Sequence, residues 1–179
     1  VFKKFSNKKM LYNKFPKITY SDAMIKYGTD KPDLRNPIII NEFTDIFKRD
    51  DVTFEIFKKL VSKGCIVRGV ITKNTKDKPR SFFDGVDKWA KSQGASGLAY
   101  FTIEKEDKVK GKGPVGKFFS SDSIEQVMKI SNAEVGDSVF LACGKKNEVE
   151  NILSLAREKI ANELNLIDYN TFAFCWIVD

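Results

Sequence analysis

Apolar residues recur along the chain at two kinds of spacing, and each kind predicts a different element. Spacings of three and four residues are typical of amphipathic helices, and they occur over residues 19–28, 81–94, 121–130 and 146–164. Alternating apolar positions, or short apolar runs, are typical of strands, and they occur over residues 52–61, 64–72, 97–105 and 137–144. The chain is therefore predicted to mix helices with strands.

Turn signals refine the boundaries of these elements. Thr19 or Ser21 can cap the first helix, and Gly28 can end it. A Ser-Lys-Gly turn at 62–64 separates two β-rich segments, which predicts a hairpin. Residues 41–47 are expected to add a short turn of helix.

The order of the elements predicts the fold class. The order β-β-α-β-α-β-α indicates an α+β two-layer sandwich, in which helices cover one side of a mainly antiparallel sheet. Ala99, Phe101 and Ile103 then face the core, and Tyr100 and Phe140 lie on the outer side of their strands. An outer aromatic ring could stack on an RNA base, or could be covered by a helix or another domain.

The last segment, TFAFCWIVD over residues 171–179, is apolar on both faces. This pattern is typical of a buried central strand, which needs a neighbour on each side. Val1 is also not a start residue. We therefore expect the chain to be part of a longer protein, and we expect residues 171–178 to present a bare apolar edge.

Composition and charge narrow the class of protein. The chain has 179 residues, of which 42% are hydrophobic, so it suits a folded domain with pieces of another. It contains no apolar run near the roughly 20 residues of a membrane span, and no signal peptide is visible. The formal charge is +7, and lysines in residues 1–17 supply six of these charges, so the remainder carries a net +1. Because the cations are mostly lysine, a codon bias explains the charge better than an arginine-rich RNA surface.

Several classes of catalytic site are excluded by the residue types. The chain has no histidine, which excludes Ser-His-Asp triads, Cys-His pairs and histidine-bound metals. Cys65, Cys143 and Cys175 lie far apart in apolar segments without zinc-site spacing. We predict that they are buried, reduced thiols.

The sequence GKGPVGKF resembles part of a phosphate-binding loop. Gly111, Gly116 and Lys117 match its G-x-x-x-x-G-K part, but Phe118 replaces the hydroxyl residue that would hold magnesium. The first glycine also comes seven residues after the predicted strand end near Glu104. A solvated loop is the better interpretation, although its lysines could still meet RNA phosphates.

Five longer stretches carry a family resemblance. TYSDAMIKYGTDKPDLRNP, WAKSQGASGLAYFTIE, GPVGKFFS, VGDSVFLACGKKNEVENILSLAREKI and FAFCWIVD occur in this order. They resemble successive blocks of bacterial-type aspartyl-tRNA synthetases of class II, and they cover most of the chain. The middle resembles the GAD domain, an α+β insertion that these enzymes share with a subunit of an archaeal-type amidotransferase.

The resemblance implies a division of the chain. Residues 1–35 would be a remnant of the class II catalytic core and the junction, and residues 36–168 would be the GAD-type insertion, with its core at about 47–144. Residues 169–179 would be a strand that returns to the catalytic core. The ATP- and aspartate-binding residues of the family would lie outside this chain.

The resemblance also implies a parent enzyme and its partners. The parent would be a cytoplasmic, homodimeric ligase that uses ATP and magnesium to attach aspartate to tRNA. Neither a membrane nor DNA is implied as a partner. Whether the parent loads only tRNA(Asp) or also tRNA(Asn) stays open. This chain alone would be non-catalytic and would need no cofactor.

Residues 27–37, YGTDKPDLRNP, would form the exit from the catalytic core into the insertion. Gly28 can end the helix, and two prolines prevent its continuation. The charged residues 30–35 are expected to pair with one another or with the rest of the ligase, or to contact tRNA directly. The candidate tRNA-binding residues are Lys31, Arg35, Lys108, Lys110, Lys112 and Lys117.

Three functions remain as alternatives. The first is an architectural insertion domain of the ligase, with a possible contact to the acceptor region of tRNA. The second is an autonomous RNA-binding module. The third is a stand-alone enzyme that uses the Gly111–Lys117 loop to bind ATP.

Overall fold

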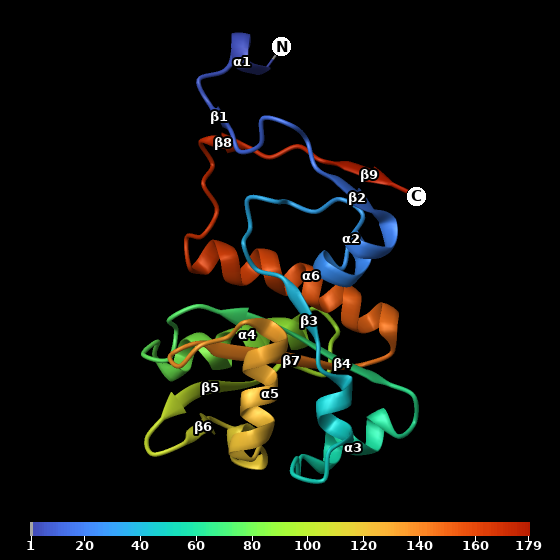
Figure 1. Cartoon of the computed structure of the whole chain (residues 1–179), viewed down its shortest axis with the longest axis vertical. Helices are drawn as coiled ribbons and strands as arrows, with labels where there is room; N and C mark the ends of the chain where they lie inside the picture. Colours follow the sequence, from blue (N-terminus) through green and yellow to red (C-terminus); the bar gives the residue numbers. More distant parts are fainter. Residues whose placement is uncertain (1) are drawn as a thin grey trace.

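The computed structural model describes residues 2–179, which form a central sheet with helices around it (Figure 1). The helices are α1 (Phe2–Phe5), α2 (Tyr20–Tyr27), α3 (Glu55–Val61), α4 (Arg80–Ser92), α5 (Ser121–Ser131), α6 (Lys146–Glu163) and the short 3-10 helices η1 (Thr44–Lys48) and η2 (Gly116–Phe118). The strands are β1 (Lys9–Met10), β2 (Lys17–Thr19), β3 (Ile40–Glu42), β4 (Ile66–Thr72), β5 (Ala99–Lys105), β6 (Val109–Lys112), β7 (Ser138–Gly144), β8 (Thr171–Phe172) and β9 (Trp176–Val178). Within residues 2–179, no helix combines the length and the hydrophobicity that a membrane crossing requires.

The central sheet has the strand order β3-β4-β7-β5-β6, and every neighbouring pair is antiparallel. Its longest pairing joins β4 to β7, from Ile66 opposite Gly144 to Thr72 opposite Ser138. This confirms the predicted α+β class with an antiparallel sheet. The edge strands β3 and β6 were not among the predicted strands, because one is very short and the other is rich in lysine and glycine.

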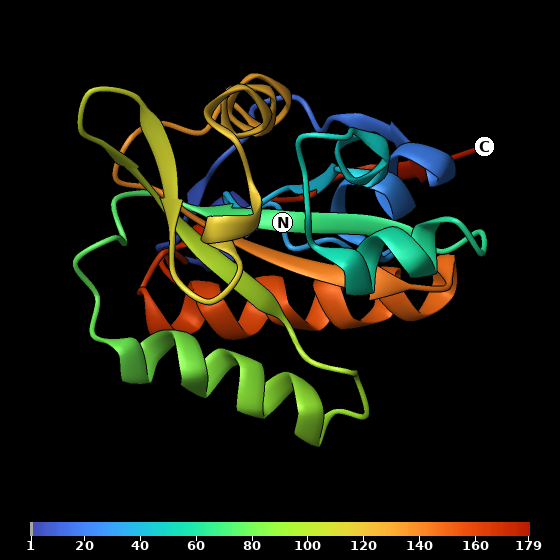
Figure 2. The ribbon, with the colours of Figure 1, turned by 90° about the horizontal axis from the view of Figure 1, so that it is seen from below.

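Helices cover both faces of this sheet, whereas the sequence predicted helices on one face only. One core packs α4 and α6 against the sheet through Tyr100 and Phe140, and a second core packs α3, α5 and η1 through Phe101 and Val139. Figure 2 shows α4 and α6 on one side of the sheet and α5 on the other. The outer aromatics are thus covered by a helix: the ring of Phe83 stacks on Tyr100 at a centroid distance of 4.8 Å.

The predicted start and stop signals of helix α2 are confirmed. The hydroxyl of Thr19 accepts a hydrogen bond from the backbone N–H of Asp22 at 3.0 Å, which caps the first turn. Gly28 ends the helix with φ 70°, a left-handed conformation that favours glycine. A side chain on Gly28 would also place its Cβ 2.3 Å from the carbonyl oxygen of Glu150. The glycine therefore also lets α2 approach α6 closely.

The predicted hairpin over residues 52–72 is wrong, because its first half forms helix α3. Phe54, Phe57 and Val61 recur at helical spacing and pack against the second core. The rings of Phe54 and Phe57 lie 4.8 Å apart. Aromatic residues favour strands in general, but packing against the core overrides this weak preference.

The two ends of the described chain lie side by side above α6 (Figure 1). β1 pairs with β8 in parallel, and β2 pairs with β9 in parallel. The expectation that residues 171–178 lack strand neighbours is therefore wrong on one side of each strand, since residues 9–10 and 17–19 pair with β8 and β9. Each pair is a two-stranded sheet, so the other edge of β8 and of β9 has no strand partner among the described residues. Burial is incomplete, however: Trp176 is 60% exposed. A long-range parallel pairing of this kind leaves no local signal in the sequence.

Candidate nucleic-acid interface

Four cationic residues surround a pocket of about 400 Å³ at one end of the central sheet. Below, this feature is called the basic pocket. It is lined by Lys76, Lys78, Arg80, Phe83, Tyr100, Thr102, Glu104, Lys112, Gly113 and Pro114. Figure 2 shows the connection from β4 to α4 and the β5–β6 hairpin approaching each other at this end, on the left of the view. The pocket therefore brings together both lysine-rich segments, 73–80 and 108–117.

A buried carboxylate fixes the connection from β4 to α4. The side chain of Asp137 is 1% exposed and accepts hydrogen bonds from the backbone N–H groups of Asn74 (2.9 Å) and Glu134 (2.8 Å). It also accepts one from the ammonium of Lys73 at 2.8 Å. The backbone N–H of Lys76 donates to the carbonyl of Gly136 at 3.0 Å. The first half of the connection is thus bound to the start of β7.

Three buried hydroxyl groups add a second anchor for the same connection. The Thr75 hydroxyl donates to Ser138 Oγ at 2.8 Å, and it lies 2.6 Å from the Thr72 hydroxyl. All three residues are buried. Because buried hydroxyls are costly without partners, this network favours one conformation of the connection.

The other wall of the pocket is the β5–β6 hairpin. Thr102 of β5 lies opposite Lys112 of β6 in the antiparallel register. The ammonium of Lys112 lies 3.1 Å from a carboxylate oxygen of Glu104. The strand register and this ion pair hold Lys112 at the pocket. Residues 109–112 form a strand, whereas the sequence analysis predicted a loop there.

The pocket carries more positive than negative charge. Arg80 pairs with Asp84 at 3.1 Å, and the Tyr100 hydroxyl donates to the same carboxylate at 3.1 Å. Burial, and then the neighbouring Asp84, raise the pKa of Tyr100, so its hydroxyl stays protonated. Lys76 and Lys78 have no ion-pair partner among residues 2–179. The arrangement can therefore attract a phosphate group, with apolar surface from Phe83 and Tyr100 beneath it.

The comparison with protein families is decisive for the middle of the chain. A family model for the GAD domain matches residues 57–153. The chain belongs to the GAD domain family. The matched range contains β4 to β7, and it contains every residue that lines the basic pocket.

The chain is also similar to curated proteins over its whole length, beyond the range matched to the GAD domain. It is 69% identical over 179 residues to the aspartate–tRNA(Asp/Asn) ligase of Pelagibacter ubique. It is 44% identical over 180 residues to the ligase of the same name from Methylorubrum populi, and 46% identical over 180 residues to that of Wolbachia pipientis wMel. Each alignment covers 100% of this chain, and 30%, 30% and 29% of the three relatives. The chain thus spans less than a third of their length.

The glycines of the predicted phosphate-like loop have a packing role in the GAD domain. A Cβ on Gly116 would lie 2.4 Å from the carbonyl carbon of Gly111, and a Cβ on Gly111 would lie 2.8 Å from Gly116 Cα. The two backbones are therefore in direct contact between β6 and η2. Gly111 lies inside β6, and Gly116 and Lys117 lie in η2, so the glycines pack two elements together and do not form a free loop between them. The interpretation of GKGPVGKF as a phosphate-binding loop is thus not supported.

Of the four candidate lysines in residues 108–117, only Lys112 lines the pocket. Lys108 is exposed in the turn of the hairpin, and Lys110 pairs with Glu106 on the same hairpin. Lys117 is exposed in η2, with its ammonium 5.2 Å from the ring centroid of Phe118. Whether these lysines contact RNA stays a prediction.

Lys31 and Arg35 lie in the connection between α2 and β3, and neither lines the basic pocket. Lys31 forms an ion pair with Asp30 at 2.9 Å. Arg35 forms a bidentate ion pair with Asp33, in which Nε lies 2.9 Å from Oδ1 and Nη2 lies 2.7 Å from Oδ2. The expected pairing of these charges with one another is therefore confirmed. The Arg35 guanidinium holds the pKa of Asp33 below its usual range. The Arg35 guanidinium also lies 5.3 Å from the ring centroid of Tyr169. Asp33 and Tyr169 thus occupy most of the guanidinium surface that another partner would contact.

Arg157 of α6 holds the junction from inside the protein. Its side chain is 2% exposed, its Nε donates to the carbonyl of Ile38 at 2.7 Å, and its guanidinium lies 4.8 Å from the ring centroid of Tyr27. The side chain of Asn36 donates to the Arg157 carbonyl at 2.9 Å. Burial lowers the pKa of Arg157, and these contacts satisfy its Nε, whereas its Nη2 is buried without a hydrogen-bond partner among the described residues. The connection from α2 to β3 is thus tied to α6 at several points.

The cysteines are free but only half-buried, so the prediction of full burial is wrong. Burial raises the pKa of the Cys143 thiol to about 12, with a smaller effect from Cys65. A thiol with this pKa is a poor nucleophile at neutral pH. Within residues 2–179, no cluster of three or more cysteine or acidic side chains is placed to hold a metal ion.

The sequence analysis missed Lys76, Lys78 and Arg80 as site residues. The available signal was the concentration of lysines in residues 73–80, which lie between a predicted strand and a predicted helix. Its significance depends on the register of β6 against β5, because that register carries Lys112 to the same place. Neither segment indicates a pocket on its own.

Proposed function

We propose that this chain is the insertion-domain region of a bacterial-type aspartate–tRNA ligase. The parent would use ATP and magnesium to attach aspartate to tRNA, as a homodimer in the cytoplasm. The observation that carries this proposal is the 69% identity to the Pelagibacter ubique ligase, which extends over all 179 residues. That relative is named for tRNA(Asp/Asn), and we propose the same pair of substrates for the parent of this chain.

The proposed role of the chain itself is architectural. Parallel strand pairs hold residues 9–19 beside residues 171–178, so the GAD domain is bracketed by two adjacent segments. This supports a division into catalytic-core segments at 1–35 and 169–179 around an insertion at 36–168. The buried contacts of Arg157 support a fixed orientation between the insertion and its junction.

The proposed contact with tRNA involves the basic side chains of the insertion. The candidates are Lys31, Arg35, Lys108, Lys110, Lys112 and Lys117. Exposed lysines attract phosphates as point charges without reading sequence. Lys108 and Lys117 are the stronger candidates, because neither has an ion-pair partner among residues 2–179, whereas Arg35 is occupied by Asp33 and Tyr169. Lys112 pairs with Glu104 but lines the basic pocket.

A chimera tests the proposed function. The matching region of the Pelagibacter ubique ligase is replaced by this chain, and the loading of aspartate onto tRNA(Asp) and tRNA(Asn) is measured. We expect kcat/KM within about tenfold of the unaltered ligase, a difference of ~1.4 kcal/mol. The isolated chain is the control, and we expect it to load no aspartate. A folded chimera without activity, or activity of the isolated chain, would contradict the proposal.

A further inference from the structure

We infer that the basic pocket holds one unstacked nucleotide of a single-stranded RNA segment. Lys76, Lys78 and Lys112 would contact its phosphates, and the exposed Pro114 would pack against its sugar or base. The inference rests on the proposed function to the extent that the natural RNA would be tRNA. The site itself is defined by the pocket and does not depend on the identity of the parent.

The charge of the pocket favours an anion. Its lining residues include four cations and one carboxylate, Glu104, which is already paired with Lys112. Lys76 and Lys78 are exposed and have no ion-pair partner among residues 2–179. Lysines without carboxylate partners are free to release counterions when they meet phosphates. The other two cations of the pocket, Lys112 and Arg80, pair with Glu104 and Asp84. Lys76 and Lys78 are therefore the two pocket cations that a phosphate can meet without displacing a carboxylate.

The shape of the pocket favours a single nucleotide over a duplex. A volume of about 400 Å³ lies within the range of small-ligand pockets, which begins near 300 Å³. A duplex presents its phosphates on a convex surface and keeps its bases stacked inside. Single-stranded RNA can place an unstacked base against apolar side chains while lysines follow its backbone. Pro114 is exposed beside the lysines and offers such a contact, whereas the rings of Phe83 and Tyr100 form the buried floor of the pocket, at 4% and 7% exposure.

Buried hydrogen bonds and strand pairing fix the backbone of the segments that line the pocket. Asp137 and the Thr75 hydroxyl fix the connection that carries Lys76 and Lys78. The register of β5 with β6 fixes Lys112. A wall that is already ordered loses little conformational entropy on binding.

The test measures binding of a fluorescently labelled single-stranded RNA 12-mer to the whole chain by anisotropy, as a function of salt. The variant Lys76→Ala/Lys78→Ala removes the two unpaired lysines. For single strands, each phosphate contact contributes roughly 0.7 to the slope of log K against log salt, so we expect the slope to fall by about 1.4. At 0.1 M salt, the same relation predicts an association constant about 25-fold lower.

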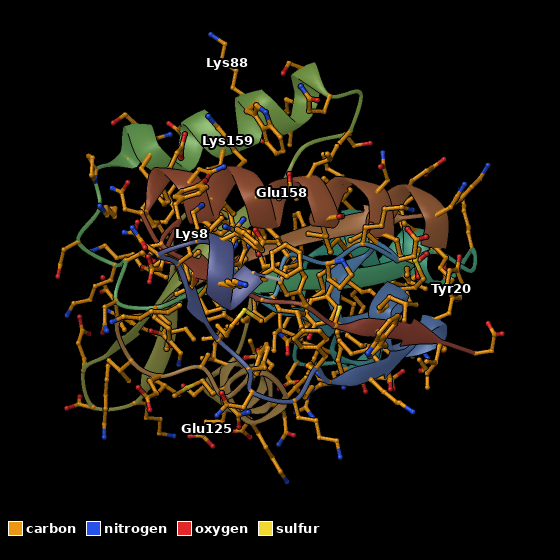
Figure 3. All side chains as sticks on the ribbon, turned by 90° about the horizontal axis from the view of Figure 1, so that it is seen from above. Lys8, Tyr20, Lys88, Glu125, Glu158 and Lys159 are labelled. Carbon is orange, nitrogen blue, oxygen red and sulfur yellow. The ribbon has the colours of Figure 1, made fainter. Side chains whose placement is uncertain are left out.

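A matched control removes the same charge elsewhere. Lys88 projects outward from α4 (Figure 3), and Lys26 is exposed on α2; neither has an ion-pair partner among residues 2–179. We expect Lys26→Ala/Lys88→Ala to bind RNA within about twofold of the unaltered chain, because charges beyond a Debye length of ~10 Å are screened. An equal loss in both variants would show diffuse attraction and would overturn the inference.

Two further arms identify the ligand class. A duplex of the same sequence is expected to bind less tightly than the single strand, and polyglutamate of equal charge is expected to bind least. Tighter binding of the duplex, or equal binding of polyglutamate, would overturn the assignment to an unstacked nucleotide. Lys78→Glu serves as a second variant, and thermal melting verifies that each variant is folded.

Chemical-shift mapping of the unaltered chain locates the site independently of any variant. Titration with a four-nucleotide RNA should shift the backbone amide signals of Thr102, Lys112 and Gly113. Shifts confined to residues outside the pocket would overturn the inference. The chimera could still load aspartate in that case, so a failure of the pocket and a failure of the proposed function are distinguishable.

Discussion

Replacing Asp137 by asparagine should destabilise the whole domain, because its carboxylate accepts three hydrogen bonds while buried. An amide keeps one acceptor oxygen and turns the other atom into a donor. In either orientation, this donor faces another N–H group. Hydrogen bonds to a charged group contribute roughly 1.5–3 kcal/mol each, so losing one and weakening the others should lower the free energy of unfolding by about 3 kcal/mol.

Urea unfolding measures this effect. With a denaturant slope of about 2 kcal/mol/M for a chain of this size, the midpoint of Asp137→Asn should fall by roughly 1.5 M. Asp50 is exposed, and Asp50→Asn is the matched control, with an expected change below about 0.5 kcal/mol. A midpoint for Asp137→Asn within about 0.3 M of the unaltered chain, at an unchanged slope, would refute the role assigned to this carboxylate.

Two further substitutions test the packing and electrostatics. Gly116→Ala should lower the free energy of unfolding by about 2 kcal/mol or more, because its Cβ would meet Gly111. The control Gly85→Ala, in open space on α4, should raise the free energy of unfolding by about 0.5–1 kcal/mol. Equal effects of the two substitutions in urea unfolding would argue against the close contact. The Arg49 side chain, followed by the Ser120 hydroxyl, lowers the pKa of Asp51 from 3.8 to about 2. The stabilisation is therefore full above pH ~4 and is lost as the pH falls towards ~2, so Asp51→Asn should cost about 1 kcal/mol at pH 7 and almost nothing near pH 2. A stability difference that does not change between these two pH values would contradict this assignment.

Local signals in the sequence predicted the local parts of the fold. The capped helix at Thr19 and Gly28 is confirmed, and so are the helices and strands between residues 80 and 163, apart from β6. The error at α3 arose because Phe54 and Phe57 fit both a strand and a helical face. Which period applies is decided by the core against which the segment packs.

The two-sided burial of the sheet had a signal that was not used. The strands around Val67, Phe101 and Phe140 are apolar at successive positions, which is typical of strands buried on both faces. The basic pocket had no comparable signal. It joins Lys76 and Lys78 to Lys112 through strand register, and register is a long-range property that neither segment reveals alone.

The most direct test of the account uses the ligase chimera with Lys76→Ala/Lys78→Ala in the inserted chain. Two activities are measured: ATP-dependent activation of aspartate, and transfer of aspartate to tRNA. The account predicts unchanged activation and a KM for tRNA raised about tenfold, the loss of ~1.4 kcal/mol of binding. An unchanged KM for tRNA, or an equal loss of both activities, would contradict it.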